Sequence, residues 1–429
     1  MRINPVIVFE LRVAIFRFRF TESFDKSDIN YIDDYRRQML EKSNTNENRG
    51  KKCDGVKNSN EINGEQLTLK INELRNIIGT DRMCGQLYEH LSLLFKDKNT
   101  NRFMVEALVL DIMSLLDSSK CVPNNVLYLD GDTPLLSAVS TGDEGVVDLL
   151  LQYNANVNAK TKDDIAPVLV AAACGHANIV DLLLQNGAPA DSRNVTGLTA
   201  LHYAANFGHS SVVENLIQRG IDIQAQSIHQ ATALHHAAQE GHQQVVEILL
   251  AAGANVHFTD DKGSTALHYS AGHGHEAISE ALIKKGANVN CKNSSNITPL
   301  YTAAAKECNE KLILLLLKFG ADINEKERLG LTALHVSSFT GNSSVVEALL
   351  KGMADVDAQI TFGSTALHLA VMGNHKATVE ILLKYGANIN LLDSAGTSVL
   401  CIAARNNNKD LLDLLIAKGM DQTFYMRPL

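Results

Sequence analysis

The sequence predicts an all-α fold, a solenoid of stacked helix pairs with short hairpin-like fingers between them. Three observations carry the prediction. A threonine recurs before an apolar helical pattern at intervals of 33 residues, a glycine separates this pattern from a second one, and another glycine follows the second. A single unit such as 232–256 buries too little apolar surface to offset the entropy of ordering it. The units must therefore stack on one another.

The threonine marks nine units in register. The intervals are 33 residues except for one of 34 between Thr298 and Thr332, and we expect the extra residue in the helical region 306–317. The position is occupied by Thr133, Ala166, Thr199, Thr232, Thr265, Thr298, Thr332, Thr365 and Ser398. Nine units in register do not arise by chance.

The residues that open the first helix resemble the T-P-L-H-x-A signature of ankyrin repeats. They read T-A-L-H-Y-A at 199–204, T-A-L-H-H-A at 232–237 and T-A-L-H-L-A at 365–370. The chain is similar to the ankyrin repeat family over residues 129–421, and no particular member is indicated. This resemblance implies an ankyrin-repeat solenoid of about nine repeats.

Local physical chemistry supports the same fold independently. A threonine before a helix can cap the free N–H groups of the first turn. Glycine at a helix end permits the left-handed conformation that stops the helix. In the second helix, Val245, Val246, Leu249 and Leu250 form an apolar stripe wide enough to bury against both neighbouring units.

The rest of the chain predicts three further segments. Residues 1–65 form an N-terminal tail that ends in a polar linker (41–65) without large apolar residues. Residues 66–128 carry three helical patterns that we expect to cap the array, and a small independent helical domain is the alternative. The three patterns cover 67–78, 83–95 and 103–116. Residues 422–429 form a C-terminal tail.

Composition excludes several classes of function. A net charge of −9 argues against binding to the nucleic-acid backbone, and no apolar run is long enough to span a membrane. Any membrane contact would be peripheral, through residues 1–20, which alternate Phe and Arg near their end but also fit a simple tail. The seven scattered cysteines include no C-x-x-C pair, so we expect a reducing compartment, the cytoplasm or the nucleus.

The 15 histidines do not predict a metal site or a catalytic site. Most of them fall on two repeat positions, and the family resemblance makes the first row structural, with hydrogen bonds between repeats. The first row is His202, His235, His268, His335 and His368, and the second is His176, His209, His242 and His275. A zinc site would need three or four converging ligands, whereas stacking spreads each row along the array.

No catalytic motif stands out. The chain contains no G-x-S-x-G, no H-E-x-x-H and no phosphate-binding loop, and the period of the repeats accounts for its glycines. We therefore predict that the protein is not an enzyme and requires no cofactor.

The remaining candidate is an interaction surface. In ankyrin repeat proteins, partners dock on the concave face formed by finger tips and first helices, so free positions there predict the site. The alternative is that some of these side chains fill gaps between fingers. The predicted contacts are Phe207, His236, Gln239, Glu240, His273, Lys306, Phe339, Met372, Arg405, Ile228, Arg328 and Phe362.

A second trait implied by the resemblance is modification. Asn158, Asn290, Asn324 and Asn390 resemble the asparagines that asparaginyl hydroxylases modify in ankyrin repeats, although closing a turn explains them equally well.

These observations predict a monomeric, non-catalytic scaffold or adaptor that binds a protein partner. The alternative is the targeting or substrate-recognition arm of a larger enzyme of the ubiquitin ligase or kinase type.

Overall fold

The structure is a computed structural model that describes residues 133–152, 154–161, 164–306 and 310–419. The predicted tails (1–65 and 422–429), the polar linker and the helical segment 66–128 lie outside the described residues. The contacts divide the described chain into two compact units. The N-terminal unit consists of residues 133–204 with 214–222, and the C-terminal unit consists of 205–213 with 223–419.

Each unit is built from pairs of short helices. The N-terminal unit contains α6 (Pro134–Thr141), α7 (Glu144–Gln152), α8 (Pro167–Cys174) and α9 (Ala177–Gln185). The division between the units passes through α10 (Ala200–Asn206) and α11 (Ser210–Gln218). The C-terminal unit contains α12 (Ala233–Glu240), α13 (Gln243–Ala251), α14 (Ala266–Gly272), α15 (Glu276–Lys284), α16 (Pro299–Ala305), α17 (Glu310–Lys318), α18 (Ala333–Thr340), α19 (Ser343–Lys351), α20 (Ala366–Met372), α21 (Lys376–Lys384), α22 (Val399–Arg405) and α23 (Lys409–Ala417).

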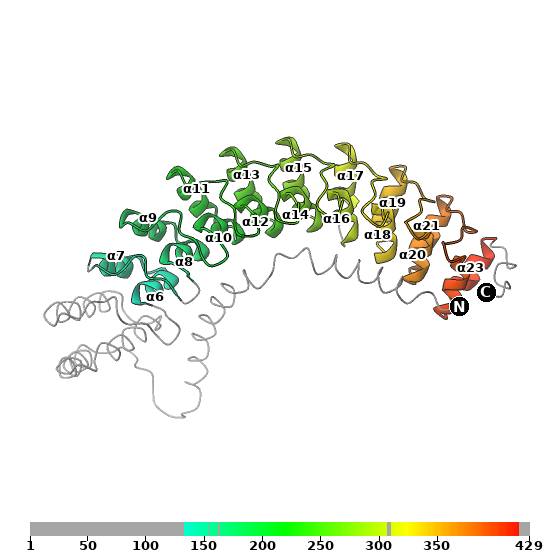
Figure 1. Ribbon diagram of the computed structural model, residues 1–429, viewed down its shortest axis with the longest axis horizontal. Helices are drawn as coiled ribbons and strands as arrows, with labels where there is room; N and C mark the ends of the chain where they lie inside the picture. Colours follow the sequence, from blue (N-terminus) through cyan, green and yellow to red (C-terminus); the bar gives the residue numbers. More distant parts are fainter. Residues whose placement is uncertain (1–132, 153, 162–163, 307–309, 420–429) are drawn as a thin grey trace, which may run out of the picture. The chain divides into compact units, whose positions relative to one another are not determined.

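Within the C-terminal unit the helices form two layers. The first helix of each pair packs against the first helix of the next pair, from α12 through α14, α16, α18 and α20 to α22. The second helices pack in the same way, from α13 to α21. Figure 1 shows the first helices side by side below the row of second helices. The predicted all-α solenoid is therefore confirmed, and no helix of the described residues is long and apolar enough to cross a membrane.

The core lies between the two layers, as the apolar stripes predict. Val245, Val246 and Leu249 on α13 are 0–1% exposed, and the alanine pair Ala237 and Ala238 on α12 is 0% exposed. Small residues at these positions let the first helices of neighbouring repeats approach closely, which close packing of the interior requires.

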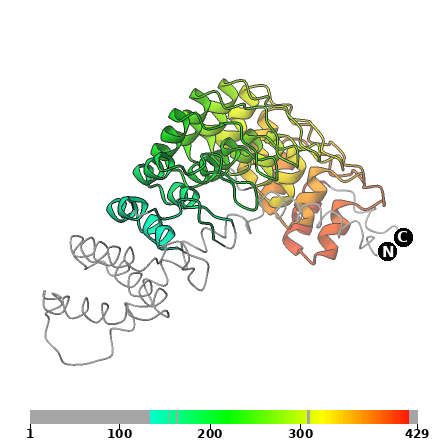
Figure 2. The ribbon, with the colours of Figure 1, turned by 60° about the vertical axis from the view of Figure 1, so that its left-hand side comes forward.

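The fingers lie along one edge of the C-terminal unit, where the connecting loops of successive repeats run side by side (Figure 2). Neighbouring fingers are joined by backbone hydrogen bonds, such as Asp261 N–H to His229 O at 2.9 Å and Ser294 N–H to Lys262 O at 2.8 Å. Their own pairing is limited to isolated bridges, and the described residues contain no strand. The fingers are thus turns joined in a row rather than a sheet.

The single extra residue of the array lies between two helices. α14 ends at Gly272 and α15 begins at Glu276, whereas α16 ends at Ala305 and α17 begins at Glu310. α17 has nine residues, like α15 and α19. The link between the helices is therefore one residue longer, and the helix is not. Our expectation of region 306–317 is sharpened to the link, because an insertion inside α17 would rotate its apolar stripe away from the core.

Candidate functional site

The first row of histidines caps the helices and joins the repeats. In the repeat that begins at Thr232, the Nδ1 atom of His235 accepts hydrogen bonds from the Thr232 N–H (3.2 Å) and the Thr232 hydroxyl (2.9 Å). The Nε2 atom donates to the carbonyl oxygen of Ser264 at 3.2 Å. A backbone N–H can only donate, so Nδ1 carries no proton and the imidazole is the neutral Nε2–H tautomer.

The same geometry recurs along the C-terminal unit. His268, His335 and His368 accept from their threonines through Nδ1, and their Nε2 atoms approach the carbonyl oxygens of Ile297 (3.0 Å), Ala358 (2.9 Å) and Thr397 (3.3 Å). Burial lowers the pKa of His235, His268 and His335 to about 4. These imidazoles are therefore neutral architecture, as the resemblance implies.

The second row of histidines also joins repeats. The Nε2 atom of His242 donates to Asn206 O at 2.8 Å, and that of His275 donates to Gln239 O at 2.9 Å. His375 makes the same bond to Phe339 O at 2.9 Å, although the sequence analysis did not assign it to the row. The 34-residue interval displaced it in a simple count. Both rows are thus occupied by hydrogen bonds, and in the part of the chain that the structure describes no group of three metal-ligating side chains converges.

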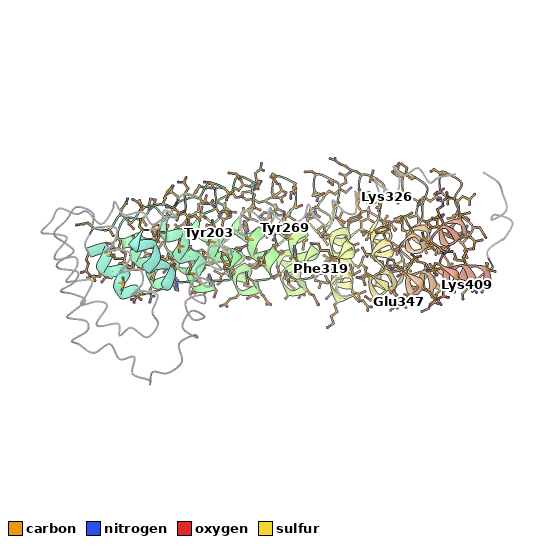
Figure 3. All side chains as sticks on the ribbon, turned by 90° about the horizontal axis from the view of Figure 1, so that it is seen from below. Tyr203, Tyr269, Phe319, Lys326, Glu347 and Lys409 are labelled. Carbon is orange, nitrogen blue, oxygen red and sulfur yellow. The ribbon has the colours of Figure 1, made fainter. Side chains whose placement is uncertain are left out.

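The fingers are held by a polar side chain at a fixed position. Asp260 accepts from the N–H groups of Lys262 (3.0 Å) and Ser264 (2.7 Å), and from the Tyr269 hydroxyl at 2.5 Å. Figure 3 shows Tyr269 at the border between helices and fingers, and Lys326 among the fingers. Asn293, Glu327 and Asp393 hold their turns with the same pair of backbone bonds. Finger shape is therefore fixed before any partner binds.

The predicted contact residues all belong to the C-terminal unit but differ in exposure. His236 is 2% exposed and Gln239 is 8% exposed, so His236 offers almost no surface to a partner. Phe339, Met372 and Phe362 are half-buried and pack against the core cluster, in line with the alternative that some of these side chains fill gaps. Phe207 and Lys306 are also half-buried. The exposed members are Glu240, His273, Arg405, Ile228 and Arg328.

One part of this face gathers hydrogen-bond acceptors. Asn206 and Gln239 occupy the same position in adjacent repeats, are 7% and 8% exposed, and hold side-chain oxygens without a hydrogen-bond partner among the described residues. The Gln239 Nε2 donates to Glu240 Oε1 at 2.9 Å, which fixes the amide orientation because a carboxylate only accepts. The sequence analysis did not select Asn206, and a buried, unpaired amide oxygen leaves no signal in a single sequence.

His273 lies beside this group. Its Nδ1 bonds to the carbonyl oxygen of Tyr269 at 2.9 Å, so Nδ1 carries the proton and the exposed Nε2 is an acceptor in the neutral ring. Desolvation of the imidazole and then the Lys306 ammonium lower the pKa of His273, whereas Glu240 raises it. The net shift is downward, which keeps His273 neutral at pH 7.

The four candidate asparagines close turns between repeats. Asn290 donates from Nδ2 to Gly320 O at 2.9 Å and accepts from Asp322 N–H at 2.8 Å, so its amide bridges two repeats. Asn324 accepts from Asp355 N–H at 2.9 Å. Asn158, in the N-terminal unit, Asn324 and Asn390 are exposed, whereas Asn290 is half-buried. Their hydroxylation stays a prediction.

Comparison with known proteins identifies the class. The family model described as "Ankyrin repeats (3 copies)" matches residues 157–227, 226–293, 280–360 and 334–425, and the "Ankyrin repeat" model matches 130–162. These matches cover more than half of the chain. The protein therefore belongs to the ankyrin repeat family, whose repeats are generally protein–protein interaction modules and typically non-catalytic.

Among solved structures, the chain is similar to one described as "Crystal structure of human ASB11 ankyrin repeat domain". The two share 29% sequence identity with a TM-score of 0.49, and the match covers 52% of this chain and 98% of that one. No curated protein matches the chain.

Proposed function

We propose that this protein is a non-catalytic scaffold or adaptor that holds a protein partner on the face formed by the first helices and finger tips of the C-terminal unit. The observation that carries the proposal is a strip of side chains that the packing does not use. Glu240, His273 and Arg405 are exposed at the ends of first helices that are otherwise buried, and Arg328 and Ile228 are exposed at finger tips, with Ile228 at 61%.

Preorganisation is the mechanism. The two histidine rows join each repeat to the next, and the fingers are tied by backbone bonds and by buried acceptors such as Asp260. A surface held in this way loses little conformational entropy when it docks. Polar and aromatic groups at fixed spacing then select a partner by complementarity, and the strip requires no chemistry of its own.

The test is affinity capture with the full chain and two charge-reversal variants. The strip variant carries Arg328→Glu and Arg405→Glu. The matched control carries Lys376→Glu and Lys409→Glu, which are exposed at the starts of the second helices α21 and α23. We expect the main captured protein to be lost by the strip variant and kept by the control.

Circular dichroism of both variants checks that they fold. Equal capture by the wild type and the strip variant, with both variants folded, would place the partner elsewhere and refute the proposal. Phe339 and Met372 are less suitable for this test, because their alanine variants would also remove packing against the core.

Two further properties belong to the same proposal. We place the scaffold in the cytoplasm or the nucleus as a monomer, which size-exclusion chromatography with light scattering and imaging of a tagged full chain would check. We also propose hydroxylation of Asn158, Asn290, Asn324 and Asn390. Peptide mass spectrometry of the protein from cells would detect the added oxygen, and unmodified peptides at all four positions would contradict it.

A further inference from the structure

We infer that the face around α10, α12 and α14 recognises an arginine side chain of the protein partner, with Glu240, Asn206, Gln239 and His273 as acceptors. The inference rests on the proposed scaffold function and names the chemistry of its partner at one place on the strip. It starts from two buried amide oxygens for which the described residues supply no donor.

The backbone of this site is fixed by the second row of histidines. Asn206 O accepts from His242 and Gln239 O accepts from His275, so both residues stand at the same register position of adjacent repeats. Their side-chain oxygens are more than nine-tenths buried and unpaired. A buried acceptor without a donor costs about 1–3 kcal/mol, so a ligand that donates to it recovers free energy that other ligands do not.

The available groups at this place accept rather than donate. The amide nitrogen of Gln239 is occupied by Glu240, which leaves the oxygen of Gln239 and the Glu240 carboxylate. The Nδ1–H of His273 is occupied by Tyr269 O, which leaves the Nε2 lone pair. A ligand that matches them must carry several donors and no acceptors. Guanidinium fits this description, with five N–H donors in a planar fork and a permanent positive charge.

Charge and shape favour the same group. Glu240 is exposed and forms no ion pair within the described residues, so its charge is available to a cation. Gly272 and Ala305 continue the position of Asn206 and Gln239 in the next two repeats, and their small size leaves room beside the acceptors. Phe207, whose ring stacks on His209 at 6.3 Å, precedes Glu240 by one repeat and offers an aromatic surface. Arginine stacks on aromatic rings and pairs with carboxylates, whereas lysine is a compact, strongly hydrated charge.

The experiment selects a random twelve-residue peptide library against the immobilised full chain. The peptides obtained are then measured by fluorescence anisotropy against the wild type and variants. Each peptide is also made with its arginine replaced by citrulline, the neutral isostere, or by lysine. We expect arginine at one recurrent position, and at least tenfold weaker binding of the citrulline form to the wild type.

Two variants and one control make the result specific. Glu240→Gln should bring the arginine and citrulline affinities to within about twofold of each other, and the Asn206→Leu, Gln239→Leu double variant should weaken the arginine form about tenfold. Glu247→Gln, on the exposed face of α13 in the same repeat, should change neither affinity. Thermal melts check folding, and the double variant replaces buried polar groups by apolar ones.

The outcomes separate this inference from the proposed function. Peptides without a recurrent arginine that still lose binding in the Arg328→Glu, Arg405→Glu variant would refute the arginine site and leave the scaffold proposal standing. Arginine discrimination that persists in Glu240→Gln would also refute the site. Failure to obtain any peptide that depends on the strip would count against both proposals.

Discussion

Two repeats of the C-terminal unit share one framework and fill it differently. We call residues 232–264 the Thr232 repeat and residues 332–364 the Thr332 repeat. In both, a threonine–histidine box opens the first helix and a left-handed glycine, Gly241 or Gly341, closes it. The second helices, α13 and α19, have nine residues each.

The differences lie at positions that the framework leaves open. Where the Thr232 repeat has Ala238, Gln239 and Gly253, the Thr332 repeat has Ser338, Phe339 and Met353. The first repeat therefore presents unpaired acceptors, and the second presents a half-buried aromatic ring. The comparison teaches that the framework sets where a side chain stands, while the residue placed there decides what it recognises. The predictions below test the framework first and the departures from it afterwards.

The largest expected effect is loss of stability in acid, because both repeats contain a buried neutral histidine. The folded pKa of His235, His268 and His335 is about 4, below the ordinary 6.5 of the unfolded chain. The unfolded state therefore binds more protons between pH 6.5 and 4, and stability falls as the pH falls through that window. At pH 4 each histidine contributes a loss of about 3 kcal/mol. Urea unfolding measured across the window checks this.

A variant makes the acid prediction specific. His335→Tyr introduces the residue that the repeat at Thr298 carries at this position, Tyr301, and should reduce the pH dependence by about one proton. Val346→Ala, which weakens the same repeat without removing a titrating group, is the control. Asp260 opposes the trend, since burial raises its pKa and its contribution is greatest in acid. A variant slope equal to that of the wild type would show that His335 does not titrate in this way.

The next effect separates two glycines of the Thr232 repeat. Both have positive φ, but a Cβ on Gly241 would lie 2.5 Å from His275 Cε1, whereas a Cβ on Gly253 meets nothing within 4 Å. Gly241→Ala should cost about 3 kcal/mol, from the left-handed backbone and the displaced bond of His275 to Gln239 O. Gly253→Ala should cost about 1 kcal/mol, from the backbone alone. Equal losses in chemical denaturation would disprove a role for the histidine contact.

These results show why the framework could be predicted from the sequence and the recognition site only partly. Thr232, His235 and Gly241 recur every repeat, so their period states a packing duty that each copy must satisfy. Glu240 and His273 were predicted because they depart from the period at the end of a first helix. Nothing in the sequence distinguishes a departing side chain that turns outward from one that turns inward, which is why His236 was predicted as a contact and is 2% exposed.

The two predictions of smaller effect concern the Thr332 repeat. Ser338 is 0% exposed and its hydroxyl has no hydrogen-bond partner among the described residues, whereas Ala238, Ala271 and Ala304 occupy the same position in other repeats. Ser338→Ala should therefore raise stability by about 1 kcal/mol, because it removes a desolvated polar group where alanine fits. Ser337→Ala is the comparison, since the Ser337 hydroxyl donates to Leu334 O at 3.2 Å and its loss should give no such gain. Both are measured by urea unfolding at pH 7, and a destabilised Ser338→Ala would contradict the assignment.

The smallest expected effect is at Met353, where other repeats end their second helix with glycine. Its φ is +68° and its side chain is 85% exposed, so the residue occupies the left-handed region without gaining burial. The left-handed conformation costs a non-glycine residue about 1–2 kcal/mol, and glycine loses about 0.5–1 kcal/mol more entropy on folding. Met353→Gly should therefore gain about 0.5–1 kcal/mol in urea unfolding, and the reciprocal Gly253→Met should lose a similar amount. If Met353→Gly lowers stability instead, the methionine side chain has a packing role that its exposure does not reveal, and the contrast between the two repeats would extend to the ends of their second helices.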